Sequence, residues 1–219
     1  MKTIYCISGL GADERAFSRL ELPGYTLVYL PWFLPLPNEP INEYALRMSS
    51  GIKEKNPLLM GLSFGGMMCI EIAKIIPVNA VILLSSISSK TGIPKWLKRI
   101  GWLKLNKIFP MRSFRIFEPI QNLVLGVTDK LEIEMVRDYR KNSPTKYNNW
   151  AINEVVNWRN TWQPKRLYHI HGDSDNTFPI KYVTPTHIVK GGGHFIIMNK
   201  AKEVSKYINE ILKNVASKK

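Results

Sequence analysis

Six short apolar runs recur along the chain, and each ends at residues typical of turns. They are four to six residues long and occupy residues 3–8, 25–30, 57–61, 80–85, 166–171 and 186–189. Their apolar positions are continuous rather than alternating, which is typical of strands that are covered on both faces. The pattern therefore predicts a mostly parallel sheet of about six strands.

Apolar residues at three- and four-residue spacing fill several of the stretches between these runs. This helical spacing covers residues 43–55, 66–76 and 201–215, and the last of these places Val204, Ile208 and Ile211 on one face. Strands that alternate with helices predict an α/β fold, with helices on the two faces of the sheet.

Residues 88–161 interrupt this alternation. The region is long, has helix-like apolar spacing and contains no convincing strand. We interpret it as a helical insertion over the sheet. The chain of 219 residues has no internal repeat or low-complexity linker, so residues 1–219 are expected to form a single domain.

The sequence Gly-Leu-Ser-Phe-Gly-Gly at residues 61–66 is the sharpest local signal, because it joins a strand-like run to a helical pattern. A serine on such a tight turn has a strained backbone, and glycines two residues to either side let the neighbouring chain pass without clashing Cβ atoms. Ser63 is therefore a candidate nucleophile. An ordinary glycine-rich turn is the alternative.

A nucleophilic serine needs a base and a group that orients the base. His194 follows three glycines after the last apolar run, and two carboxylates, Asp173 and Asp175, follow the run before it. The ends of parallel strands meet at one edge of a sheet, so these side chains are expected near Ser63. Either carboxylate could also be a turn-forming side chain.

A rival cluster begins at His169, His171 and Asp173, whose alternate spacing resembles a metallo-hydrolase motif. Ser174 stands where that motif needs its next histidine, so His187 or His194 would have to complete the site. His194 is better used as the base of Ser63. We therefore expect no metal and no cofactor.

Three motifs together resemble the α/β-hydrolase superfamily, in particular its serine esterases and lipases. They are Ser-Gly-Leu-Gly at residues 8–11, the Gly-x-Ser-x-Gly sequence around Ser63, and Gly-Asp-Ser-Asp-Asn-Thr-Phe-Pro at residues 172–179. The chain order Ser, Asp, His is also that of this superfamily. The resemblance extends over almost the whole chain.

This resemblance implies a role for each motif. Ser63 would be the nucleophile, His194 the general base and Asp175 its carboxylate partner, while the backbone N–H groups of Leu10 and Phe64 would form the oxyanion hole. Ser8 stands where the family often has histidine, so the support of that loop would differ. The family commonly has two further strands before this loop, whereas this sequence begins almost on it, so we expect a minimal sheet of about six strands.

The segment 88–119 combines positive charge with aromatic residues, since eight Lys and Arg residues stand against Glu118 alone. In the family such an insertion commonly forms a lid over the acyl pocket. By this resemblance Trp96, Trp102 and Phe109 are candidate substrate-binding residues. The alternative is an amphipathic cap whose basic face is simply solvated.

Composition narrows the possible partners and cellular locations of the protein. The net charge of +14 comes from scattered lysines without a nucleic-acid motif, so we expect no nucleic-acid partner. No apolar run approaches the ~20 residues of a membrane span, so stable membrane insertion is not expected. Cys6 and Cys69 lie in apolar segments, which suits reduced thiols in the cytoplasm. No pattern indicates a particular oligomeric state.

The expected function is hydrolysis of a small-molecule carboxylic ester or thioester through an acyl-enzyme on Ser63. Acyl transfer and hydrolysis of certain carbon–carbon bonds use the same groups and stay open as alternatives. A catalytically silent binding protein on the same scaffold is a further alternative, because fold alone does not fix function.

Overall fold

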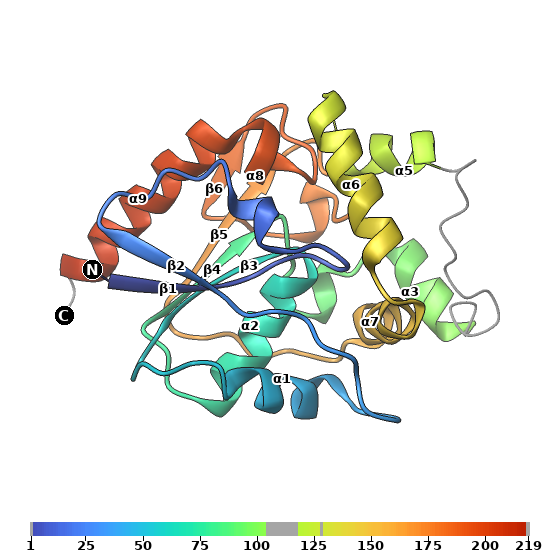
Figure 1. Ribbon diagram of the computed structural model, residues 1–219, viewed down its shortest axis with the longest axis horizontal. Helices are drawn as coiled ribbons and strands as arrows, with labels where there is room; N and C mark the ends of the chain where they lie inside the picture. The colour runs from blue at the N-terminus through green and yellow to red at the C-terminus, as the bar shows by residue number, and fades with distance from the viewer. Residues whose placement is uncertain (1, 104–117, 128, 218–219) are drawn as a thin grey trace.

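A single six-stranded parallel sheet forms the centre of the computed structural model, which describes residues 2–103, 118–127 and 129–217 (Figure 1). The strand order is β2-β1-β3-β4-β5-β6, and every neighbouring pair is parallel. The strands are β1 (Lys2–Ile7), β2 (Tyr25–Tyr29), β3 (Leu58–Leu62), β4 (Ala80–Leu84), β5 (Leu167–Gly172) and β6 (His187–Val189). The predicted sheet of about six strands is confirmed.

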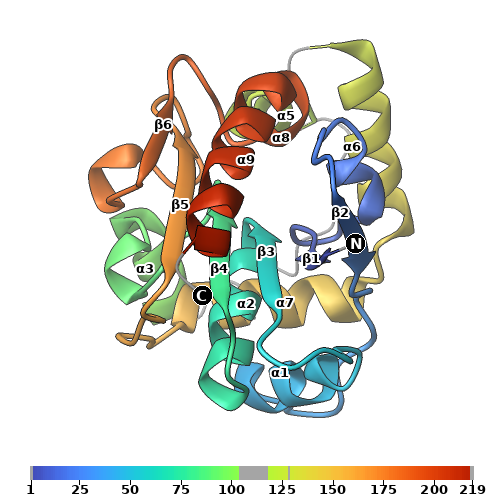
Figure 2. The ribbon, with the colours of Figure 1, turned by 90° about the vertical axis from the view of Figure 1, so that its left-hand side faces the viewer.

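The sheet is covered on both faces because alternate side chains of each strand point to opposite sides. Ile4 and Cys6 of β1 pack in one core with α9 (Ala201–Ser217). Tyr5 and Ile7 pack in a second core with α1 (Ile41–Ser49) and α2 (Phe64–Ile75). Figure 2 shows α9 and the α1–α2 pair on opposite sides of the strands. This arrangement explains why the strands read as continuous apolar runs.

The two cysteines lie one in each core. Cys6 belongs to the α9 side of the sheet and Cys69 to the α2 side, and both are free thiols that solvent does not reach. Burial raises the pKa of both thiols well above the ordinary value.

The first helix differs from its prediction. It spans Ile41–Ser49 rather than residues 43–55, since Pro40 in extended conformation precedes it and the amides of Ser50 and Gly51 close its last turn on the carbonyls of Arg47 and Met48. After Ile52, the exposed polar residues 53–56 give the helix no apolar face with which to continue. The other two predicted helices are present with slightly different ends, as α2 and α9.

Within residues 88–161, the described part contains helices and no strand. They are η2 (Lys90–Gly92), α3 (Lys95–Trp102), α5 (Glu118–Leu125), α6 (Lys130–Asn142) and α7 (Thr145–Asn157). Tyr147, Ala151 and Val155 of α7 lie in the α2-side core. Gly101 lets α3 approach Val156 of α7 closely. The role of this region as a lid stays a prediction.

The remaining short elements are η1 (Glu14–Phe17), η4 (Ile180–Tyr182) and α8 (Ile196–Asn199). Across the part of the chain that the structure describes, no helix is both long and apolar enough to span a lipid bilayer.

Gly65 in the first turn of α2 is expected to tolerate no larger residue. A Cβ atom there would overlap the carbonyl oxygens of Ile7 and Ser8, which are backbone atoms of β1 and its following loop. We expect Gly65→Ala to lower the free energy of unfolding by about 3 kcal/mol, as in severe overpacking. Urea denaturation followed by circular dichroism measures this change.

Gly9→Ala is the matched control, because a Cβ at Gly9 would meet its nearest atom, the Cβ of Ser63, at an ordinary 3.5 Å. Its effect on stability should stay below about 1 kcal/mol. Equal stability of the two variants would contradict the packing argument.

Candidate active site

Ser63 occupies a sharp turn between β3 and α2. Its backbone angles are φ 52° and ψ −119°, a region that costs free energy for any residue with a Cβ. Hydrogen bonds hold this backbone: the Ser63 amide donates to Leu84 O at 2.9 Å, and its carbonyl accepts from Ser86 Oγ at 2.6 Å. Gly61 allows the tight return, because a Cβ there would overlap the backbone of Gly65. The turn thus presents the half-buried Ser63 side chain at the end of the strand.

A continuous chain of hydrogen bonds links Ser63, His194 and Asp175. His194 Nε2 lies 2.9 Å from Ser63 Oγ, and His194 Nδ1 lies 2.8 Å from Asp175 Oδ2. The three residues follow β3, β6 and β5, so they meet at the carboxyl edge of the sheet. A carboxylate only accepts hydrogen bonds, so Nδ1 carries the proton of the neutral imidazole and Nε2 is left to accept from the serine hydroxyl.

Asp175 is buried and fully supplied with donors. Its Oδ1 accepts from the amides of Thr177 and Phe178, each at 2.8 Å. Its Oδ2 lies 3.4 Å from His171 Nε2 in addition to its contact with His194. Burial acts to raise the pKa of Asp175, but the neighbouring His194 and these hydrogen bonds outweigh it and lower the pKa below its ordinary value. The carboxylate therefore stays ionised at neutral pH.

Asp173 has a different place. Its side chain is exposed, and its Oδ1 accepts from the Gly191 amide at 2.8 Å and from Ser174 Oγ at 3.0 Å. It thereby joins the loop after β5 to the loop that carries His194. The structure brings Asp175, and not Asp173, into contact with the imidazole.

His169 and His171 form a buried pair behind Asp175. His169 Nε2 lies 3.0 Å from His171 Nδ1, and His171 Nε2 lies 2.8 Å from Phe178 O. One nitrogen of His169 and both nitrogens of His171 are thus engaged in these contacts, whereas Asp173 contacts Ser174 and Gly191. Among residues 2–103, 118–127 and 129–217, no three His, Cys, Asp or Glu side chains are grouped as metal ligands. That the protein works without a metal stays a prediction.

Acidic solution is expected to destabilise the fold through His169. Burial, with His171 beside it, lowers the pKa of His169 to about 3, whereas an unfolded histidine titrates near 6.5. Between these values the unfolded chain binds the extra proton, so stability is retained above about pH 6.5 and falls below it by up to about 1.4 kcal/mol per pH unit. Urea denaturation of wild type and His169→Gln at pH 7 and pH 5 measures this. The variant should lose less stability between the two pH values; equal losses would refute the assignment.

The loop at residues 8–11 lies beside Ser63. Ser8 Oγ donates to Ala12 O at 2.6 Å and accepts from Trp32 Nε1 at 3.0 Å. The serine that stands in place of the family's histidine therefore closes the loop through its hydroxyl. Gly9 lies against Ser63, and Phe64 is the first residue of α2. Leu10 thus follows a residue that lies against Ser63, Phe64 follows Ser63 itself, and their action as oxyanion donors stays a prediction.

Trp32 is a site-forming residue that sequence reasoning missed. It lies in a proline-rich stretch after β2, and its indole Nε1 also donates to Gly9 O at 3.1 Å. Trp32 lies 23 residues from Gly9 in the chain, and it belongs to no periodic pattern or motif that could have predicted this contact from the sequence. Next to this loop is a cavity of about 420 Å³, whose lining includes Gly11, Trp32, Phe33, Pro144 and Tyr147.

Two of the three candidate lid residues are exposed to solvent. Trp96 and Trp102 lie on α3 and are 49% and 80% exposed, respectively. Phe109 lies outside the described residues. A contact of these three side chains with substrate stays a prediction.

Solved structures of esterases and related proteins share this architecture. MenH from S. aureus aligns with a TM-score of 0.75 at 16% identity, covering 98% of this chain and 94% of that one. An esterase from Exiguobacterium antarcticum aligns with a TM-score of 0.70 at 10% identity, with coverage of 97% and 92%. A lipase-esterase related protein from Clostridium acetobutylicum gives 0.70 at 17% identity, with 96% and 94%. The chain has the α/β-hydrolase fold.

The sequence itself is far from these proteins. No protein-family model matches it, and a search of curated proteins gives no match either. The α/β-hydrolase fold, predicted from the motifs at residues 8–11, 61–65 and 172–179, is therefore established through its three-dimensional arrangement.

Proposed function

We propose that this protein hydrolyses carboxylic ester or thioester bonds of small molecules through an acyl-enzyme on Ser63. The observation that carries the proposal is the unbroken hydrogen-bond chain from Ser63 Oγ through His194 to the buried Asp175. It occurs at the carboxyl edge of a fold shared with an esterase and a lipase-esterase related protein.

The arrangement fits each step of acyl transfer to water. Ser63 Oγ attacks the acyl carbon while His194 Nε2 accepts the hydroxyl proton. The amides of Leu10 and Phe64 then donate to the oxyanion of the tetrahedral intermediate, which is worth roughly 3 kcal/mol per donor in characterised hydrolases. His194 returns the proton to the leaving group, and water repeats the sequence on the acyl-enzyme. Asp175 holds the Nδ1–H tautomer throughout.

Residues 88–161 would act as the lid in this proposal. Support comes from the junction of α6 and α7, where Ser143 Oγ lies 3.1 Å from the position of a Cβ on Gly11, in the candidate oxyanion loop. The helical region therefore reaches the site. A cytoplasmic location is also part of the proposal and rests on the two reduced, buried thiols.

Purified protein assayed against p-nitrophenyl esters of increasing chain length and against acyl thioesters tests the proposal. We expect turnover of at least one series and covalent labelling by a fluorophosphonate, both unchanged by EDTA. Folded protein that shows neither turnover nor labelling would favour the catalytically silent scaffold. Loss of activity in EDTA with rescue by zinc would favour a metal site at His169 and His171.

A further inference from the structure

The indole of Trp32 touches both sides of the candidate oxyanion hole. Its Nε1 donates to Gly9 O at 3.1 Å and to Ser8 Oγ at 3.0 Å, on one side. Its ring stacks on the ring of Phe64 on the other, with centroids 5.2 Å apart and planes 11° apart. One side chain thus connects the loop that carries Leu10 to the first residue of α2.

The contact with Gly9 O bears directly on the proposed donor of Leu10. The Gly9 carbonyl and the Leu10 N–H belong to the same peptide unit, which is planar and trans, so they point in opposite directions. Fixing the carbonyl therefore fixes the direction of the N–H. The Ala12 amide also donates to Gly9 O, at 3.0 Å, and adds to this constraint from within the loop.

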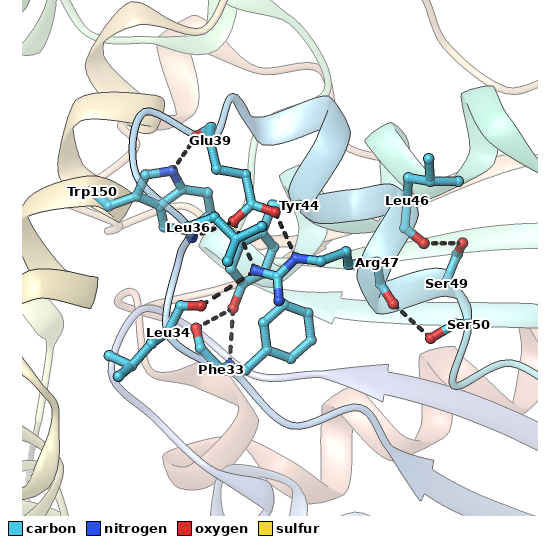
Figure 3. A network of polar contacts seen from close by, with 10 residues as sticks. All are labelled: Phe33, Leu34, Leu36, Glu39, Tyr44, Leu46, Arg47, Ser49, Ser50 and Trp150. Carbon is cyan, nitrogen blue, oxygen red and sulfur yellow. Dashed lines mark hydrogen bonds and ion pairs between the residues drawn. The ribbon is translucent and has the colours of Figure 1, made fainter.

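The segment that carries Trp32 is itself held firmly (Figure 3). Arg47 donates from Nε and Nη2 to the two oxygens of the buried Glu39 carboxylate at 2.6 and 2.7 Å. Glu39 also accepts from the Leu36 amide at 2.8 Å, and Tyr44 bonds to both the amide and the carbonyl of Phe33. The hydrogen bonds of Arg47 lower the pKa of Glu39, which keeps the ion pair intact. Residues 33–39 are thus fastened to α1.

We propose that Trp32 is a positioning residue that sets the Leu10 N–H relative to the Phe64 N–H for oxyanion binding; this inference rests on the proposed function. Oxyanion donors lower the barrier when they are already oriented before charge develops. A displacement of about 1 Å in such a site can cost about a hundredfold in rate. Trp32 supplies the orientation through an indole N–H, which a phenylalanine ring at this position would lack.

Trp32→Phe in the full-length protein separates the hydrogen bonds from the stacking, because phenylalanine keeps a ring against Phe64. We expect kcat for a p-nitrophenyl ester to fall by about ten- to a hundredfold while KM stays within about twofold. Inhibition by a phenylboronic acid, whose tetrahedral serine adduct places an oxygen in the oxyanion hole, should weaken by a similar factor.

Trp158→Phe is the matched control. It removes an indole N–H that donates to Glu71 at 2.7 Å, in the same core but about two turns of α2 beyond Phe64. Its kcat should stay within about twofold of wild type even if its melting temperature falls as far as that of Trp32→Phe.

A second variant at position 32 carries benzothienylalanine, which keeps the bicyclic shape of the indole and replaces its N–H with sulfur. It should reproduce the loss of kcat.

The outcomes are separable. Wild type without turnover or fluorophosphonate labelling would remove the proposed function and this inference together. An active wild type in which the position-32 variants match Trp158→Phe in kcat and in boronate affinity would overturn the inference alone, and would leave Trp32 as a packing residue.

Discussion

Replacing Ser63 with alanine is expected to lower kcat by about a millionfold, which most assays would register as a complete loss of turnover. The variant lacks the only atom that the proposed mechanism uses to attack the acyl carbon, and His194 is then left without a proton to accept. The fold should survive, since alanine keeps the Cβ and the backbone bonds of residue 63 to Leu84 and Ser86 do not involve the side chain. Ester turnover and circular dichroism measure these two consequences, and fluorophosphonate labelling should be lost together with turnover.

Ser174→Ala serves as the control for this substitution. Ser174 is an exposed serine in the loop after β5, and its hydroxyl bonds to Asp173 rather than to His194. Turnover should stay within about twofold of wild type. Persistent labelling of Ser63→Ala would assign the nucleophile to another residue.

The second large effect is expected for Asp175→Asn, which should lower kcat by about ten thousandfold. Asparagine keeps one oxygen that can accept from the amides of Thr177 and Phe178, so the loop should stay folded. Its amide nitrogen, however, donates toward His194 Nδ1 and favours the imidazole tautomer that has its proton on Nε2. That tautomer cannot accept the proton of Ser63.

Asp173→Asn is the companion variant two residues away. Its oxygen can still accept from the Gly191 amide, and its side chain is exposed, so the loss of activity should stay within about threefold. Steady-state kinetics of both variants, with equal folding shown by thermal denaturation, decides the ranking. The reverse order would make Asp173 the carboxylate partner of His194.

These two aspartates show where sequence reasoning ends. Strands that are buried on both faces can be recognised in the sequence, because every position of β3 and β4 must be apolar. The turn at Ser63 is also visible in the sequence, as the two glycines Gly61 and Gly65, because a Cβ at either position would overlap the backbone of neighbouring residues. For Asp173 and Asp175, by contrast, only the resemblance to the family's motif at residues 172–179 favoured Asp175. Their separation depends on the path of the loop after β5, which buries one and exposes the other.

Contacts between residues far apart in the chain are even harder to predict from the sequence. Trp32 meets Gly9 because the segment after β2 folds back over the loop that follows β1, and the ion pair of Glu39 and Arg47 ties this segment to α1. The helical spacing of residues 88–161 indicates helices, but which face of α3 meets a neighbour is decided by its packing on α7. Trp102, a candidate substrate-binding residue by resemblance, is 80% exposed in this arrangement.

The burial of Cys6 and Cys69 has a practical consequence for following motion in this molecule. Thiol-directed dyes react with the thiolate, and the raised pKa values and inaccessible positions of both cysteines keep that form scarce at neutral pH. A cysteine introduced in place of the exposed Trp102 would thus be the single reactive thiol of the protein. A fluorophore attached there could report displacement of α3 when ester is added, without prior removal of the native cysteines.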